Sequence, residues 1–301
     1  MRTGACKQRF SSIDAQAEQL TDFDQQYEQV GSGNFSGAFM AVDGERVGVF
    51  VECTNRVLHQ QGAGPLDRVS AVVLLESPTA TTSNGTGFGV EDVLLVGPGG
   101  SYDAMVGSGV MPAVFSVSLD LTPALPLRRL AAHQRGQVRL IPDAALSRQF
   151  RHTAAGVLQS WDAATQTAEV PEEKVQGLML DLLTTPAASG GSSCRSLELF
   201  RRTKAIMVDS LREQIPISEV ASRACTSRRS VEQAFRESVG LSPNRFRKLL
   251  RLNNARRLLE QGSHSVTEAA VDSGLFHLGR FSFEYRDLFG EQPSGTARRS
   301  R

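Results

Sequence analysis

The sequence predicts an α+β protein of two domains, and three observations support this fold class. Short runs of β-branched and apolar residues, separated by turn signals, occupy most of the chain up to about residue 140, and helical periodicity dominates after residue 196. Between the two textures lies TTPAASGGSSCR, residues 184–195, whose composition indicates a flexible linker. With 301 residues, 40% of them hydrophobic, the chain is long enough to bury two cores.

The N-terminal part alternates predicted strands with turns. Its turns are VDGE, QGAGP, SNGTG and GPGGSYD, and its clearest strands are RVGVFVE (46–52), RVSAVVLLE (68–76), VEDVLLV (90–96) and AVFSVSLD (113–120). Strands at this spacing, from about residue 35 to residue 140, predict a β-barrel of the jelly-roll or cupin-like kind. Helical patterns follow over about 142–183, in two segments divided near Val170 and Pro171. Residues 1–183 are therefore predicted to form one domain.

The C-terminal part shows helix signals throughout. Thr226 or Ser227 can cap one helix, which Gly240 ends, and Ser242 can cap the next, which begins with Pro243. The expected helices span residues 197–212, 217–223, 227–240, 242–262, 265–274 and 277–290.

Two short-then-long helix pairs share one plan. Each has a small or apolar pair in the short helix, a turn residue, and two large apolar residues four apart in the long helix. These residues are Val220-Ala221, Cys225, Val231 and Phe235 in the first pair, and Ala269-Ala270, Gly274, Phe281 and Tyr285 in the second. This is the layout of a helix-turn-helix, whose second helix enters the major groove of DNA. We predict such units at 217–240 and 265–290, within an all-α domain at 196–294 that a basic tail, 295–301, follows.

The stretch GLFHLGRFSFEYRDLFGEQPS, residues 274–294, carries a feature that stability alone does not explain. Phe281, Tyr285 and Leu288 have the spacing of a buried helical stripe, yet the first turn contains Gly279 and Arg280. Glycine weakens a helix. We therefore expect this tip to enter a groove, where the backbone approaches base edges and the arginine reaches them.

The formal net charge of +1 conceals an asymmetry. Residues 196–301 contain 19 Lys and Arg and 12 Asp and Glu, a net charge of +7, whereas residues 1–195 contain 14 and 20, a net charge of −6. A basic C-terminal part joined to an acidic remainder favours an anionic partner, double-stranded DNA, for the former.

The C-terminal hundred residues resemble the DNA-binding domain of the AraC/XylS family of bacterial transcriptional regulators. The matching positions are Ile217, Ala221, Ser227, Arg229, Val231, Phe235, Gly240, Ser242-Pro243, Arg251-Leu252, Ala255, Leu258-Leu259, Val266, Ala269-Ala270, Gly274, Phe281, Tyr285, Phe289-Gly290 and Pro293. The chain departs from the family pattern at Leu275, Phe246 and Phe283. The N-terminal domain resembles the family's effector domain in texture and in the loop LHQQGAGP.

This resemblance implies a sequence-specific regulator, an activator, whose N-terminal domain binds a small organic effector and mediates dimerisation. Each monomer would cover about 17–20 base pairs with its two units. RNA polymerase and a second copy of the chain are the expected protein partners. No secretory signal or membrane-spanning run is evident, so we expect a cytoplasmic protein that makes no membrane contact.

The DNA contacts follow from the exposed faces of the two predicted recognition helices. Arginine pairs with guanine, glutamine with adenine, and an apolar side chain with the thymine methyl group. The expected base contacts are Arg228, Arg229, Ser230, Glu232, Gln233, Gly279, Arg280 and Phe283. The expected phosphate contacts are Ser227, Arg245, Lys248, His277, Leu278 and Ser282. Arg251 either meets a phosphate or pairs with Asp272 or Glu268.

Other chemistry finds little support in the sequence. The histidines His59, His133 and His152 lack the spacing of a metal site, and the scattered cysteines indicate free thiols, so we expect no cofactor and no metal. Aromatic residues that could line an effector pocket are Phe50, Phe88, Tyr102 and Trp161. Two alternatives remain: a ligand-independent accessory DNA-binding protein, and a cupin-like or DNA-repair enzyme fused to a DNA-binding module.

Overall fold

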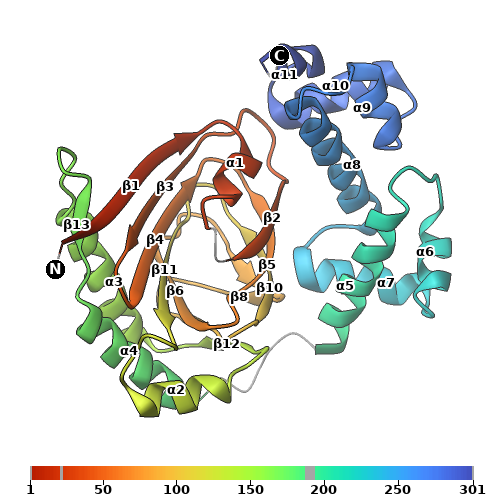
Figure 1. The fold of residues 1–301 in the computed structure, drawn as a ribbon. Helices are drawn as coiled ribbons and strands as arrows, with labels where there is room; N and C mark the ends of the chain where they lie inside the picture. Colours follow the sequence, from red (N-terminus) through yellow and green to blue (C-terminus); the bar gives the residue numbers. More distant parts are fainter. Residues whose placement is uncertain (1, 21–22, 187–193, 300–301) are drawn as a thin grey trace. The chain divides into compact units, whose positions relative to one another are not determined.

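The computed structural model describes residues 2–20, 23–186 and 194–299 (Figure 1). Contacts divide the chain into two compact units. The first comprises Met1–Tyr27, Ser36–Asn55 and Gln60–Gly190, and the second comprises Glu28–Phe35, Arg56–His59 and Gly191–Arg301. Most of the predicted linker at 184–195 lies outside the described residues.

Two β-sheets form the N-terminal half. The larger has eight strands in the order β12-β9-β6-β11-β4-β3-β1-β13, with all neighbours antiparallel, and the smaller has five in the order β2-β5-β10-β7-β8. The strands are β1 Arg2–Phe10, β2 Asp24–Gln29, β3 Gly37–Asp43, β4 Val47–Thr54, β5 Leu58–Ala63, β6 Arg68–Glu76, β7 Thr82–Ser83, β8 Thr86–Gly87, β9 Val93–Val96, β10 Ser101–Val106, β11 Met111–Ser118, β12 Val138–Ile141 and β13 Thr167–Glu169.

Side-chain alternation gives the larger sheet two buried faces. Along β4, Val47, Val49 and Val51 belong to one core, whereas Phe50 and Glu52 point to the opposite face. The same alternation recurs in β6, β9 and β11, which explains their nearly continuous apolar sequences. One face packs against helices and the other faces the smaller sheet.

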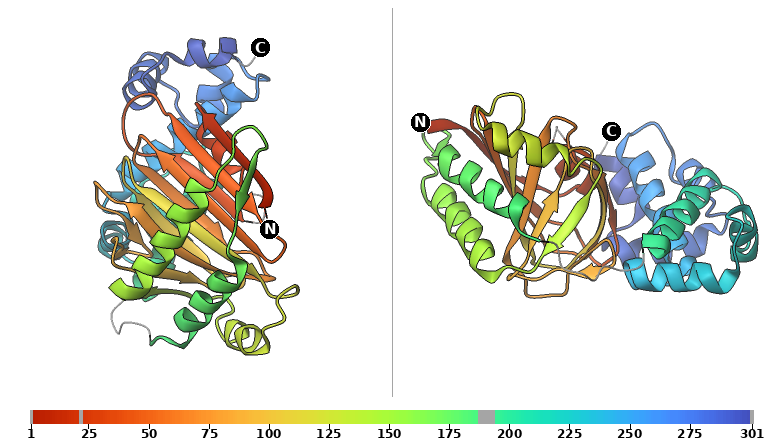
Figure 2. Two further views of the ribbon diagram at one scale, coloured as in Figure 1. Left: turned by 90° about the vertical axis from the view of Figure 1, so that its left-hand side faces the viewer. Right: turned by 90° about the horizontal axis from the view of Figure 1, so that it is seen from below.

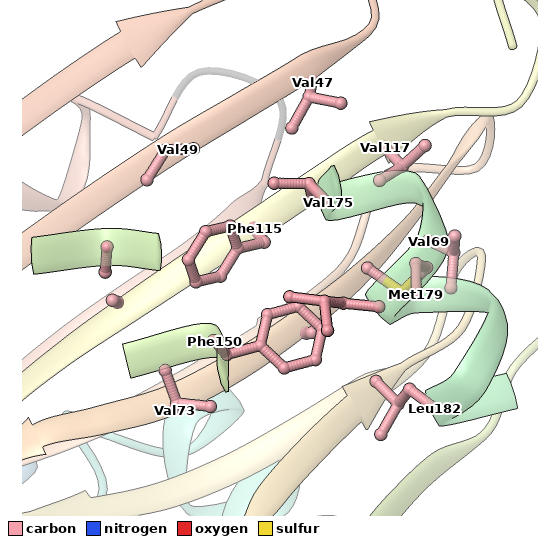
Figure 3. Close-up of a cluster of buried hydrophobic side chains, with 14 of the residues drawn as sticks. Val47, Val49, Val69, Val73, Phe115, Val117, Phe150, Val175, Met179 and Leu182 are labelled. Carbon is pink, nitrogen blue, oxygen red and sulfur yellow. The ribbon is translucent and has the colours of Figure 1, made fainter. Parts of the chain in front are cut away.

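Three helices cover the first face: α2 (Leu125–Ala132), α3 (Ala144–Gln159) and α4 (Glu172–Thr184). In Figure 2, left, they lie across the strands. The carboxylate of Asp143 caps α3 by accepting from the amides of Ala145 and Leu146 at 3.0 and 2.9 Å. Phe115 of β11 and Phe150 of α3 meet at the centre of the core, with ring centroids 5.1 Å apart (Figure 3).

The predicted combination of an antiparallel β domain and a helical domain is confirmed, and each of the four quoted strand runs overlaps a strand. The sheets face each other without closing into a barrel. The prediction that strands begin near residue 35 and end near residue 140 is wrong at both ends, because β1 and β2 precede that range and β13 follows it. The polar sequence of β1, RTGACKQRF, hides its alternation, and β13 is too short to show any. Helix α2 and the short α1 (Ile13–Ala17) were also not predicted.

The second unit contains seven helices among its described residues. They are α5 Cys194–Asp209, α6 Ile217–Arg223, α7 Arg228–Val239, α8 Pro243–Glu260, α9 Val266–Asp272, α10 Leu278–Phe289 and α11 Pro293–Arg299. The pairs α6–α7 and α9–α10 are the two expected short-then-long units, and α8 connects them (Figure 1).

The helix ends follow the expected cap chemistry. Ser227 and Ser242 accept from the amides of Ser230 and Arg245 at 3.1 and 3.3 Å, and Ser265 caps α9 through a reciprocal capping box. The Gly240 and Gly290 caps that end the two long helices have φ of 68° and 72°, a left-handed conformation that glycine adopts at little cost.

The two units also share the conformation of their turns. Cys225 and Gly274, at equivalent places, have φ of 49° and 71°. Cys225 is exposed in its turn. This agreement of sequence and backbone supports the interpretation of the units as a repeat.

Helix α8 supports each unit through a separate aromatic cluster. Phe246 of α8 contacts Phe200 of α5 and Phe235 of α7, with ring centroids 5.6 and 5.4 Å apart. Further along α8, Leu252 and Leu259 belong to the core that contains Phe281, Tyr285 and Phe289 of α10. Both units therefore pack against the same helix, α8.

We predict that Phe150→Ala lowers the free energy of unfolding of the first unit by about 3–5 kcal/mol, because it leaves a cavity under the sheet. Urea titration followed by circular dichroism measures this change. Gln149→Ala, on the exposed side of the same helix, is the control and is expected to change it by less than about 0.5 kcal/mol. Equal effects of both variants would contradict the assignment of this core.

Candidate nucleic-acid interface and ligand cavity

Helix α7 presents a polar face to solvent. Arg228 and Arg229 are exposed, and Arg228 pairs with Glu232 across one helical turn, at 2.9 Å. Gln233 is exposed and donates to the carboxylate of Glu237 at 2.6 Å. Such contacts between exposed groups are weak and readily exchanged for a ligand. The predicted base contacts of the first unit cover a wide arc of α7: Arg229, Ser230 and Gln233 line a hollow beside the start of α5, and the Arg228–Glu232 pair lies beside them.

Ser227 and Ser230 occupy the N-terminal end of that helix. Their hydroxyl oxygens lie 2.8 Å apart, and Ser227 is exposed while Ser230 is half-buried. The amides of a helix N-terminus favour an anion. This geometry is compatible with a phosphate near Ser227.

The first turn of α10 is unusually open. His277 stands at the cap position without a side-chain cap bond, and Leu278 is 41% exposed. A Cβ added to Gly279 would meet no atom within 4 Å, so packing does not require a glycine there. Arg280 and Phe283 are exposed, at 73% for the arginine side chain and 62% for the phenylalanine, and Ser282 is half-buried. The surface is accessible to a large partner.

Glu284 holds two cations at this surface. Its Oε1 atom accepts from Lys248 Nζ of α8 at 2.8 Å and from Arg280 Nε at 2.9 Å. Partial burial raises the pKa of Glu284, but the two hydrogen-bonded cations outweigh it and bring that pKa below its ordinary value. The carboxylate therefore remains ionised and orients both predicted DNA contacts.

The basic residues of α8 divide into structural and exposed ones. Arg251 is buried and donates to the carbonyl oxygens of Leu211 and Glu213 at 3.0 and 2.6 Å. Our expectation of an ion pair with Asp272 or Glu268 is wrong, because these carbonyls already engage the guanidinium. Arg245 is exposed in the first turn, and Lys248 pairs with Glu284.

One exposed residue of this surface was not predicted. Phe276, immediately before α10, is 50% exposed and joins Leu278 and Phe283 as large apolar side chains open to solvent. Phe276 lies in the turn before α10, where an apolar residue is expected to be buried, so the sequence did not indicate that it is exposed. Asn244 was also missed; with Arg247, Lys248, His277 and Arg280 it lines a hollow between α8 and the start of α10.

A cavity of about 70 Å³ lies between the two sheets of the first unit. Apolar side chains dominate its wall, with Gln25, Tyr27, Glu52, Gln60 and Tyr102 gathered among them. The other lining residues are Leu20, Phe23, Val72, Leu74, Thr81, Ser83, Phe88, Leu94, Val96, Ala104, Val106, Pro112 and Val114.

The structure places the predicted pocket residues in different surroundings. Phe88 and Tyr102 line the cavity. Phe50 and Trp161 do not: Phe50 stacks on Phe39, with ring centroids 6.3 Å apart, and Trp161 packs against the core beneath the helices. Phe50 shares its face of β4 with Glu52, but it joins the neighbouring cluster of Leu20, Phe23 and Phe39 instead of the cavity lining. Within residues 2–20, 23–186 and 194–299, no group of three or more His, Cys, Asp or Glu is arranged to hold a metal.

Comparisons with known proteins match the C-terminal part. A family model described as a helix-turn-helix domain covers residues 220–299. The chain is 33% identical over 148 residues to the XylDLEGF operon transcriptional activator 3 of Pseudomonas putida, covering 46% of this chain and 44% of that protein. It is 36% identical to a solved probable AraC family transcriptional regulator of Rhodopseudomonas palustris, covering 35% of this chain and 98% of that one, with a TM-score of 0.32.

Through its C-terminal domain, the chain belongs to the AraC/XylS family. Another relative is the HTH-type transcriptional regulator GbdR of Pseudomonas aeruginosa, 39% identical over 89 residues, which are 30% of this chain and 24% of that protein. The chain spans less than half the length of these two curated relatives. Among its described residues, no helix is both long and apolar enough to cross a membrane.

We predict that Gly279→Ala stabilises the domain of this AraC/XylS member by about 0.5–1 kcal/mol, since alanine favours a helix, and at the same time weakens DNA binding. The measurements are thermal unfolding and titration of a labelled target duplex. Gly156→Ala in α3, at an exposed position where an added Cβ also meets no atom within 4 Å, is the control: it should stabilise its own unit and leave DNA binding unchanged. An increase in both stability and DNA affinity would contradict a close approach of this backbone to DNA.

Proposed function

We propose that the protein is a sequence-specific DNA-binding transcriptional regulator, an activator, in which each monomer uses both helix-turn-helix units. The observation that carries the proposal is the pair of exposed polar recognition faces, on α7 and α10, fixed to one helix. The charge of +7 over residues 196–301 supports an anionic partner. The relatives named above are themselves called transcriptional activators or regulators.

The two units would contact successive major-groove segments. Helix α8 has 18 residues and is about 27 Å long, comparable with the roughly 34 Å of one DNA turn. Arg229 and Gln233 of α7, and Arg280 and Phe283 of α10, would read base edges. Lys248 would meet a phosphate together with the exposed residues at the helix starts.

The N-terminal domain would bind the effector to which the regulator responds. Its cavity is enclosed by two sheets and lined by apolar residues with a small polar group, which is typical of a site for a small organic molecule. Its sheets and helices would also form the dimer contact. RNA polymerase is the expected partner at the promoter, and the cytoplasm the expected place of action. No catalytic activity forms part of this function.

We expect Arg280→Ala and Gln233→Ala each to cost about 1–3 kcal/mol of specific binding and to relax the preference at one base pair. Lys248→Ala should instead weaken binding to all sequences and reduce the salt dependence by about one phosphate contact. The measurement is genome-wide binding-site mapping, followed by affinity titration on the motif at several salt concentrations.

Arg148→Ala, which removes an exposed charge from the N-terminal α3, is the matched control. It should leave both the motif and the affinity unchanged. If the Arg280 and Gln233 variants retained the same sharp peaks as the wild type, the assignment of the recognition helices would be wrong.

A further inference from the structure

The lining of the cavity between the sheets contains an acidic residue but no basic one. Glu52 of β4 lines it and is buried, with 7% of its surface exposed, whereas none of the described residues in its lining is Lys, Arg or His. A buried carboxylate without a counter-charge is costly in a protein interior. The cavity lining therefore provides no cationic side chain to neutralise the Glu52 carboxylate.

Neutral groups hold Glu52 in place. Its Oε2 atom accepts from the Tyr27 hydroxyl at 3.0 Å and from Gln16 Nε2 at 3.3 Å, and its Oε1 atom accepts from Gln60 Nε2 at 2.9 Å. A carboxylate can accept about four hydrogen bonds, so Oε1 retains capacity for a further donor. Burial raises the pKa of Glu52, and these three donors offset that rise only in part.

A second polar group in the lining has no partner. The hydroxyl of Ser83, on β7 of the opposite sheet, is buried with the serine only 4% exposed, and no hydrogen bond satisfies it in the structure. Buried hydroxyls in proteins are nearly always hydrogen-bonded. A ligand with a polar group in this cavity would satisfy it.

We propose that the cavity binds a small cation, a protonated primary amine on a short apolar body, with its ammonium group donating to Glu52. The inference rests on the proposed function, since it names the chemical class of the effector. The ammonium supplies the missing counter-charge, and one of its remaining N–H groups is available to the Ser83 hydroxyl. Val72, Leu74 and Val114 would enclose the apolar body.

Charge and size exclude other classes. A carboxylate ligand would meet Glu52 without any cation in the described lining to balance it. A cavity of about 150 Å³ accommodates benzene, and at about 70 Å³ this one suits a smaller body. We therefore expect a short aliphatic amine to bind without rearrangement of the sheets.

The test uses three probes of equal chain length, ethylamine, ethanol and acetate, on the full chain. Calorimetric titration and thermal unfolding should show saturable binding of ethylamine, binding of ethanol at least about tenfold weaker, and no binding of acetate. Glu52→Gln keeps the side-chain shape and should weaken ethylamine binding about tenfold, to the level of the alcohol.

A second variant keeps the proposal testable if Glu52→Gln fails to fold. Ala104→Leu fills the cavity from β10 without altering Glu52 and should abolish binding of all three probes; circular dichroism checks the fold of both variants. Equal binding of amine, alcohol and carboxylate, unchanged amine binding by Glu52→Gln, or no binding of amine to the wild type would overturn the proposal. Target-DNA binding, measured without probes, reports separately on the proposed function.

Discussion

The rest of the C-terminal domain depends on the burial of α8 around most of its circumference. Residues such as Phe246, Leu249, Leu252 and Leu259 are buried on different sides of this helix. A helix that packs on one side only would be amphipathic, whereas α8 contacts a helix-turn-helix unit at each end. Dispersion and hydrophobic contacts thereby fix the two recognition helices to one another without any direct contact being required between them.

Two arginines of α8 are buried together with its apolar residues. Arg251 and Arg256 are buried, and each has acceptors within reach: backbone carbonyls for Arg251, and Glu260 and Glu291 for Arg256. Arg256 also lies over the Phe289 ring at 4.8 Å. These guanidinium groups are occupied within the domain, which leaves Arg245 and Lys248 as the phosphate contacts that we propose for this helix.

In the first unit, the alternation of side chains along β4 decides which of them face the helices and which face the smaller sheet. Val47, Val49 and Val51 fill the core beneath the helices, and this leaves Phe50 and Glu52 on the face toward the smaller sheet. A carboxylate at such a position stabilises little by itself, since its burial is unfavourable. Its presence in a mostly apolar cavity is the observation on which the proposed recognition of a cationic ligand rests.

The sequence predicted the C-terminal domain closely because its signals are local. The caps at Ser227 and Ser242, the left-handed Gly240 and the four-residue spacing of Phe281 and Tyr285 each specify a helix boundary or face without reference to distant residues. The N-terminal domain was harder, because strand partners are distant in sequence: β1 pairs with β13 across more than 150 residues. Trp161 was misplaced for the same reason, since only tertiary packing decides which core an aromatic residue joins.

The most direct test of the account is the spacing of the DNA site. Once the motif is known, the affinity of the full chain is measured for duplexes in which five base pairs are inserted between the segments read by the two units. Five base pairs rotate one segment by about half a turn. Because α8 is rigid, we predict that the insertion weakens binding as much as replacing the second segment entirely; retention of the original affinity would contradict the account of two units fixed on one helix.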